Sequence, residues 1–522
     1  MWAATLLRNT SGGMQVDWLT AAPCEVAFTP NSIHHTVREE ELQGLTLFDG
    51  VKACRHSNMA RGNGLTQALD EAPLGLFHLR AVLTAGAGFF TDAYDLFIIG
   101  AALVLLKGQW NLDKGTIGLI GATSLIAAFV GAFLFGRISD LVGRKKVYGL
   151  EATIMAIGAI LSAFSPNVVW LIVFRFIMGI GIGGDYPVSA VLMSEYANVR
   201  DRGKLVSLVF SMQALGLIAG PIVAITLLAS GINPNIAWRI MLGLGAIPAL
   251  FVIYSRRRMP ESPRYEALVE GRSKAAAQNL KVYSAGQVQV DAEDAPARRM
   301  SFGEFMTNPR LLLTLIGTAG TWFLFDYAYY GNAISTPLIM NLIAPNATPV
   351  MTEAWTLIIF AVAAVPGYIL AFTTIDRIGH KRLQMIGFAV MGAAFLLMGA
   401  IPGITTAVVP FLILYALSYF FAEFGPNTTT FVLSAELFPV SVRTTGHGMS
   451  AGVAKVGAFL GTFLFPVLTG ALGLSGTLMV TCVFSVFGLL LTMVLPEPAG
   501  KSMEDISADA QTTAEESRLR IS

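Results

Sequence analysis

Residues 169–204 read VWLIVFRFIMGIGIGGDYPVSAVLMSEYANVRDRGK, and most of this stretch is apolar enough and long enough to span a bilayer. Two ionisable residues, Arg175 and Asp185, nevertheless lie inside it. A charged residue within a membrane costs about 2.5–3.5 kcal/mol on insertion scales, so it rarely occurs without a partner or a function. Asp185 follows a run of glycines, which permits close approach to the backbone. The stretch indicates either a helix-packing patch with a structural acid or a substrate or proton site at membrane depth.

The composition is that of a membrane protein with many spans. Of the 522 residues, 54% are hydrophobic and only 13% are charged, and the mean hydropathy is +0.62. The net charge of +1 gives no reason to expect nucleic acid. Three cysteines support neither a disulfide framework nor a zinc site. Since no catalytic motif or nucleotide fingerprint stands out, we expect no enzyme, no metal and no cofactor other than a coupling ion.

Hydropathy predicts twelve membrane spans in two similar halves, separated by one long charged loop. The spans are expected at about 81–106, 116–136, 147–165, within 169–204, and at about 205–229, 239–255, 311–340, 355–375, 384–402, 408–434, 446–472 and 476–495. The domains follow as 1–79, 80–255, 256–310, 311–496 and 497–522. We expect a disordered cytoplasmic tail over 1–79, of which 1–58 is alternatively an over-extended start, and a second disordered tail over 497–522. The halves are two membrane bundles, joined by the cytoplasmic loop.

The loops between spans give the orientation and reveal an internal repeat. Basic residues cluster in the loops after spans two, four, six, eight and ten, which places both termini in the cytoplasm. The loop GRISDLVGRKK (136–146) is echoed six spans later by TTIDRIGHKR (373–382). An offset of six spans is what two parallel halves require.

These two loops, together with PESPR at 260–264, resemble the major facilitator superfamily over residues 80–496. The resemblance implies an all-α membrane protein with twelve transmembrane helices in two six-helix bundles, working by alternating access. Loop charges can hold a neighbouring helix end in one conformation and release it in another. We therefore expect gating by Asp140, Arg144 and Asp376, although simple anchoring on the cytoplasmic side would explain some of the neighbouring basic residues.

A narrower resemblance rests on GGDYPVSAVLMSE at 183–195, which is similar to the signature of the phosphate:proton symporter family. GFFTDAYDLF at 88–97 and FGPNTTTF at 424–431 agree with it in sequence and order. The resemblance implies a phosphate site lined by Tyr186, Gln213, Trp322, Asp326, Tyr330, Asn427 and Lys455. It links Asp92 and Asp185 to the proton path, with Asp95 and Glu151 as further candidates. The expected partners are inorganic phosphate, protons and the lipid bilayer, in the plasma membrane, with no oligomer required.

The residues themselves support an anion site. Trp322, Asp326 and Tyr330 stand four apart, so one helix presents them as a stripe about 12 Å long. Lys455 supplies one compact positive charge for phosphate. Asp326 can accept a hydrogen bond from a protonated phosphate hydroxyl, which sulfate lacks. The alternative is an aromatic packing stripe with one satisfied acid.

One departure and two rival functions stay open. Glu423 precedes FGPN where an amide or a small residue is expected, so it adds a titratable group close to the predicted site. The first rival is a carrier of the same fold for sugars, organic acids or other oxyanions, although Lys455 with Asp326 favours an anion over a neutral sugar. The second rival is a nutrient sensor that binds phosphate without transporting it.

Overall fold

The computed structural model describes residues 64–283 and 300–506, all of which belong to one compact unit, residues 59–522. The prediction for residues 1–58 lies outside the described residues. In the described ranges every regular element is a helix, and eleven helical segments are long and apolar enough to cross a membrane. The last of them, α22 (Arg443–Thr492), breaks at Gly473, where φ is 69° and ψ is 176°, so it supplies two spans. The twelve predicted spans are therefore present.

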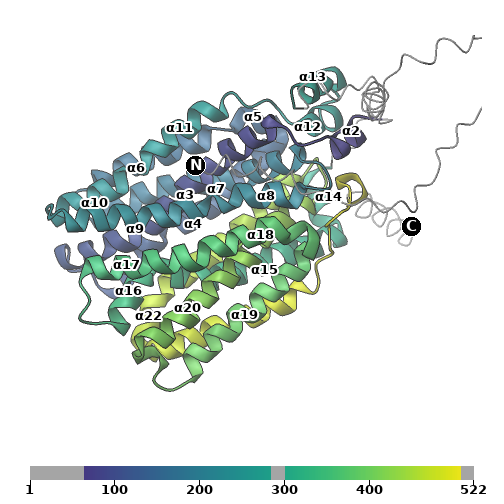
Figure 1. Ribbon diagram of the computed structural model, residues 1–522. Coiled ribbons are helices and arrows are strands. Elements are labelled where there is room, and N and C mark those ends of the chain that lie inside the picture. The colour runs from purple at the N-terminus through teal and green to yellow at the C-terminus, as the bar shows by residue number, and fades with distance from the viewer. Residues whose placement is uncertain (1–63, 284–299, 507–522) are drawn as a thin grey trace, which may run out of the picture. The chain divides into compact units, whose positions relative to one another are not determined.

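The two halves of the chain form two sets of helices that lie alongside each other (Figure 1). The first half consists of α3 (Leu76–Gln109), α4 (Lys114–Val142), α5 (Arg144–Val147), α6 (Leu150–Ala163), α7 (Val168–Tyr196), α8 (Arg202–Ser211), α9 (Gln213–Ala229), α10 (Pro234–Gly243) and α11 (Ala246–Arg256). The second half consists of α15 (Pro309–Ile334), α16 (Thr336–Ile343), α17 (Pro349–Ile359), η3 (Phe360–Ala364), α18 (Val365–Ile378), α19 (His380–Ala400), η4 (Ile404–Thr406), α20 (Val408–Ala422), η5 (Glu423–Asn427), α21 (Thr428–Glu436) and α22.

The segments expected to lack structure contain short helices. Residues 65–71, placed in the disordered tail by sequence, form α2 (Leu65–Glu71), and the loop over 256–310 contains α12 (Pro263–Leu268), α13 (Ser273–Tyr283) and α14 (Phe302–Thr307). The first residues after 496 are also ordered against the bundle ends. Arg264 binds both Asp70 and Glu504 and so ties α2 and the C-terminal segment to α12. Burial opposes ionisation of Glu504, but the Arg264 guanidinium outweighs it and lowers the pKa of that carboxyl.

The internal repeat is visible in the backbone. Gly143 separates α4 from α5 with φ 101° and ψ 148°, and Gly379 separates α18 from α19 with φ 94° and ψ 142°. Both conformations lie in the region that favours glycine. Each glycine follows a helix whose last turn contains an acid, Asp140 in one half and Asp376 in the other. The motif that hydropathy assigned to a loop is thus the end of a long helix and a tight break.

A distorted turn in the tenth span positions part of the candidate site. α20 passes into the π-helical turn η5, where Gly425 has φ −110° and ψ −107° before Pro426. Proline lacks the N–H that the helix ladder needs, and such turns are frequent at functional sites. Glu423 and Asn427 lie at the two ends of this turn and are both buried.

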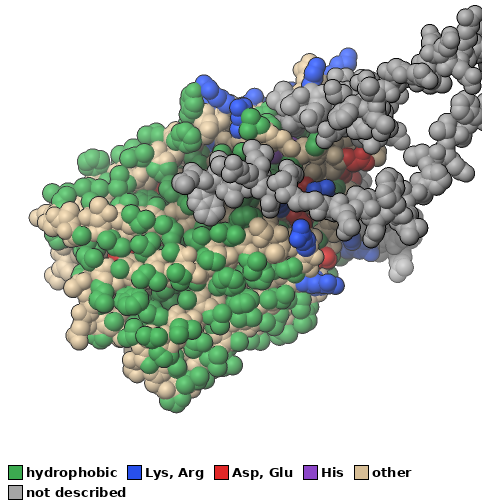
Figure 2. All heavy atoms as spheres, in the orientation of Figure 1, with side chains coloured by type: hydrophobic (Ala, Val, Ile, Leu, Met, Phe, Trp, Pro, Cys, Tyr) green, Lys and Arg blue, Asp and Glu red, His purple; other side chains and the backbone are tan. Residues whose placement is uncertain are grey.

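On the face seen in Figure 2, most of the charged side chains gather at one end of the protein. In the space-filling view the long sides are mostly hydrophobic, whereas Lys, Arg, Asp and Glu side chains gather at the end that carries α2, α12 and α13 (Figure 2). Exposed apolar side chains on the helices, such as Phe164, Ile247 and Phe487, would face lipid. The apolar sides and this charged end fit a protein with several membrane spans.

Candidate functional site

A buried ion pair joins two helices of the second half, α15 and α22. The Lys455 ammonium on α22 is 2.9 Å from Asp326 Oδ2 on α15 and donates a hydrogen bond of 3.1 Å to the Tyr330 hydroxyl. Both charged side chains are 1% exposed. A buried pair is tolerated only when hydrogen bonds satisfy the remaining atoms, yet Asp326 Oδ1 has no partner among the described residues. This oxygen could accept a hydrogen bond from a ligand, and the Trp322 side chain is a neighbouring donor that also interacts with the carboxylate.

The ion pair is connected to the first half through two phenols. The Tyr186 hydroxyl on α7 lies 3.4 Å from the Tyr330 hydroxyl and accepts a hydrogen bond of 3.2 Å from Gln213 Nε2 at the start of α9. The Lys455 ammonium sits 4.5 Å from the Tyr186 ring centroid and 4.4 Å from that of Tyr330. Cation–π contacts of this kind stabilise a desolvated ammonium. The two halves thus share one polar centre.

The network continues back into the second half through a tyrosine that the sequence does not single out. The Tyr368 hydroxyl on α18 donates to Gln213 Oε1 at 3.2 Å and accepts from Asn427 Nδ2 at 2.9 Å. Asn427 Nδ2 also donates to Glu423, which accepts a hydrogen bond of 2.6 Å from the Tyr329 hydroxyl. Tyr368 lies in an apolar run with no motif around it, so only its neighbours in space reveal it.

Trp322 interacts with the Asp326 carboxylate, but most of its contacts are with other aromatic rings. Its ring packs against the rings of Tyr186, Phe431 and His447, at centroid distances of 6.1, 6.2 and 5.5 Å. Phe431 in turn stacks on Phe210 at 4.4 Å. Aromatic walls of this kind exclude water and so strengthen the electrostatic interactions beside them. In this structure Trp322 forms a wall of the polar centre.

The predicted proton-linked acids on α6 and α7 share one cation. Arg256 places Nη1 at 2.7 Å from Glu151 and Nη2 at 2.7 Å from Asp185, and all three side chains are 0% exposed. The Ser189 hydroxyl donates to Asp185 at 2.5 Å, and the Gly149 amide donates to Glu151 at 2.7 Å. Sequence reasoning counted Arg256 among the basic loop residues. The structure corrects this, because α11 extends to Arg256 and turns its side chain into the bundle.

The two acids on α3 interact electrostatically but make different direct contacts. Asp92 is fully buried, and both its carboxylate oxygens lack a hydrogen-bond partner within residues 64–283 and 300–506. Asp95 lies against Gly245, where a methyl group would overlap its carboxylate. Arg175 is also buried; its Nε donates to the Ile120 carbonyl at 3.2 Å. Asp92 and Asp95 therefore have different neighbours, although they are three residues apart.

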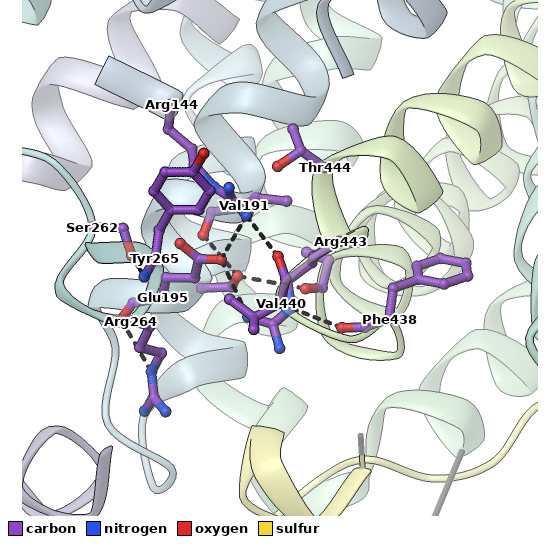
Figure 3. A network of polar contacts seen from close by, with 12 residues as sticks. Arg144, Val191, Glu195, Ser262, Arg264, Tyr265, Phe438, Val440, Arg443 and Thr444 are labelled. Atoms are coloured by element: carbon purple, nitrogen blue, oxygen red, sulfur yellow. Dashed lines mark hydrogen bonds and ion pairs between the residues drawn. The ribbon is translucent and has the colours of Figure 1, made fainter. Parts of the chain in front are cut away.

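Arg144, one of the predicted gating residues, joins the two halves at the charged end (Figure 3). Arg144 contacts Asp140 at 3.1 Å and Glu195 at 3.2 Å, and it donates to the Val440 carbonyl of the other half at 2.9 Å. Arg443, also from the other half, reaches the same Glu195 oxygen at 3.3 Å. Sequence reasoning missed Glu195 and Arg443, which close this network.

Further contacts at this end also cross between the halves. Asp140 accepts hydrogen bonds from the Thr445 amide and hydroxyl at 2.6 and 2.7 Å. Asp376 accepts one of 2.8 Å from the Lys204 amide and lies 3.4 Å from His380. Ionic and polar contacts from both repeats of the loop motif therefore connect the two halves at the charged end.

The comparisons with known proteins agree with this geometry. The chain matches the model of the sugar (and other) transporter family over residues 81–510. It is 37% identical over 513 residues to inorganic phosphate transporter 1-4 of Arabidopsis thaliana, covering 85% of this chain and 95% of that one. It is 36% identical over 514 residues to inorganic phosphate transporter 1-6 of Oryza sativa subsp. japonica, covering 86% and 96%. The solved proton:xylose symporter XylE, bound to 6-bromo-6-deoxy-D-glucose, superposes with a TM-score of 0.70 at 20% identity, covering 83% and 99%.

Twelve spans in two repeated halves, with a shared polar centre, define a membrane protein with the major facilitator fold. The chain belongs to the sugar (and other) transporter family, in the group of inorganic phosphate transporters to which these relatives belong. The predictions of fold, of family and of a protein that is not an enzyme are confirmed.

Proposed function

We propose that this protein carries inorganic phosphate together with protons across the plasma membrane by alternating access, with both termini in the cytoplasm. The observation that carries the proposal is the Lys455–Asp326 pair, which leaves one Asp326 oxygen unpartnered among the described residues and lies at the junction of the two halves. The names of the relatives, which align over nearly their whole length, support phosphate as the substrate.

The chemistry of the centre suits a protonated oxyanion. Lys455 would bind a negatively charged oxygen of phosphate, and the Tyr186 and Tyr330 hydroxyls would turn from each other to donate to it. Asp326 Oδ1 would accept from the phosphate hydroxyl. Sulfate has no such hydroxyl at physiological pH, so it would leave a buried carboxylate unpaired, and a site of this kind rejects it.

Proton coupling would use the acids of the first half. Arg256 balances only one of the two charges on Glu151 and Asp185, so one proton bound to either carboxylate would leave the cluster neutral. Asp92 has no hydrogen-bond partner among the described residues and would hold another. Asp185 is adjacent in sequence to Tyr186. A shift of the backbone that accompanies protonation of the cluster would therefore also move Tyr186 in the phosphate site.

Alternating access would follow from release of the contacts at the charged end. The basic residues at this end support a cytoplasmic location for it under the positive-inside rule. Breaking the contacts of Asp140, Arg144 and Asp376 would let the halves rock apart and expose the centre to the cytoplasm.

The test is phosphate binding and uptake by the purified protein in proteoliposomes. Wild type should take up labelled phosphate, with unlabelled phosphate competing at least tenfold better than sulfate. Asp326→Asn should lose this preference, because an amide can donate to sulfate. Saturable binding without uptake would show a sensor instead, and failure to bind phosphate would contradict the proposed substrate.

A further inference from the structure

Glu423 is a buried acid that the proposed function leaves unused. It starts the turn η5, its side chain is 0% exposed, and both its oxygens accept hydrogen bonds, from Tyr329 at 2.6 Å and from Asn427. Both donors are neutral, and no Lys, Arg or His of the described residues lies within ion-pair distance of it. Burying a charge without a cation is costly, so such a group takes a proton readily.

The elements packed around Glu423 supply no compensating charge. α15 contributes Tyr329, α18 contributes Tyr368 and α20 contributes Tyr419, which are all neutral phenols. The nearest part of α19 contributes Gln384, which pairs with Thr429 rather than with the acid. The cation of this half, Lys455, is already paired with Asp326.

Glu423 is nevertheless linked to the phosphate site by an unbroken run of hydrogen bonds. The run passes from Glu423 through Asn427, Tyr368 and Gln213 to Tyr186, where it meets the Lys455–Tyr330 contact. Every link is between side chains that are at most 3% exposed. A change of charge on Glu423 therefore polarises a continuous set of hydrogen bonds that reaches the phosphate site.

Charge balance then gives the direction of the effect. Lys455 and Asp326 cancel, so the centre has no net charge when Glu423 is protonated and a charge of −1 when it is ionised. A phosphate anion adds further negative charge, and like charges repel strongly where water is excluded. Protonation of Glu423 and binding of phosphate must each favour the other, because linkage is reciprocal.

We propose that Glu423 is a proton-binding residue of the substrate site itself, which takes up one proton when phosphate binds and so adds one proton to those carried by the acids of the first half. The inference rests on the proposed function. It also assigns a role to the acid that replaces the expected amide or small residue before FGPN.

The experiment measures proton uptake on phosphate binding by the detergent-purified protein, with a pH-sensitive dye in weak buffer. Glu423→Gln should take up one proton fewer per phosphate than wild type. A plot of log phosphate affinity against pH should be less steep for Glu423→Gln, by about one unit of slope. The affinity of the variant should therefore change about tenfold less per pH unit than that of wild type. Wild type and variant are compared at the same pH, so that protons bound or released by phosphate itself contribute equally to both measurements. The matched control is Glu353→Gln on α17, a buried acid, 3% exposed, outside the hydrogen-bonded run.

The outcomes separate the two proposals. Wild-type proton uptake in Glu423→Gln, or the same loss in Glu353→Gln, would overturn the assignment while leaving phosphate transport intact. Failure of wild type to bind phosphate would overturn the proposed function and this inference with it. If Glu423→Gln does not fold, the same proton-uptake measurement on Tyr329→Phe tests the proposal. It removes the donor to the carboxylate, so the proton should still be taken up but at higher pH, and an unchanged pH dependence would contradict the role.

Discussion

The cluster of Arg256 with Asp185 and Glu151 gives a prediction whose size follows from the structure. One guanidinium contacts two carboxylates at 2.7 Å each, and none of the three side chains is exposed. Arg256→Gln leaves both acids buried without a cation. Breaking a buried pair by removing one partner costs about 3–5 kcal/mol, and here two pairs share the lost partner. We expect destabilisation at the upper end of that range at neutral pH.

The assay is thermal unfolding of the detergent-purified protein at pH 7.5 and pH 5. Size-exclusion chromatography measures how much folded protein remains after heating at each temperature. Arg256→Gln should unfold at a clearly lower temperature at pH 7.5. Acidification should restore part of the loss, because protonation removes the unpaired charges. Asp185→Asn in the same background should restore more, since residues in one ionic network are not additive. Equal unfolding temperatures of wild type and Arg256→Gln at pH 7.5, or no rescue of Arg256→Gln by Asp185→Asn, would refute the account of this cluster.

Three further changes test the site, the packing and the gate. Tyr368→Phe removes two hydrogen bonds of about 0.5–1.5 kcal/mol each. The KM for phosphate should therefore rise about tenfold while protein yield stays normal. An unchanged KM would contradict the place of Tyr368 in the site. Gly88→Ala should impair transport and stability because its methyl would overlap the Arg256 guanidinium, whereas Gly108→Ala, with no neighbouring atom within 4 Å, should do neither. Asp140→Asn weakens contacts between the halves, so amide hydrogen exchange at the start of α22 should increase, and unaltered exchange would argue against gating.

The fold could be predicted because its signals are local. Long apolar runs define the spans, and the repeated loop motif defines the two halves. Boundaries were less accurate, because α4 extends past the apolar run to Val142, through a polar last turn that lies between neighbouring helices. Helices α2 and α12 escaped prediction because their stability comes from contacts such as that of Arg264 with Asp70, not from periodicity.

The centre of the site was predicted in part. Six of the seven residues implied by the family motifs lie in one hydrogen-bonded network, and Trp322 lines it, although their roles remain proposals. Tyr368 and Arg256 were missed for different reasons. A single tyrosine in an apolar span carries no sequence signal, and an arginine at a helix end looks like any cytoplasmic cation until its direction is known.

The most direct test of the central claim is to record phosphate and proton fluxes together in the same proteoliposomes, with an imposed gradient that is acidic outside. The account predicts that wild type accumulates phosphate above equilibrium with protons moving inward, and that collapse of the gradient stops the accumulation. Asp185→Asn should still exchange phosphate across the membrane but should not accumulate it. Accumulation at the wild-type level in Asp185→Asn, or phosphate flux in wild type without any proton flux, would contradict proton-coupled phosphate transport.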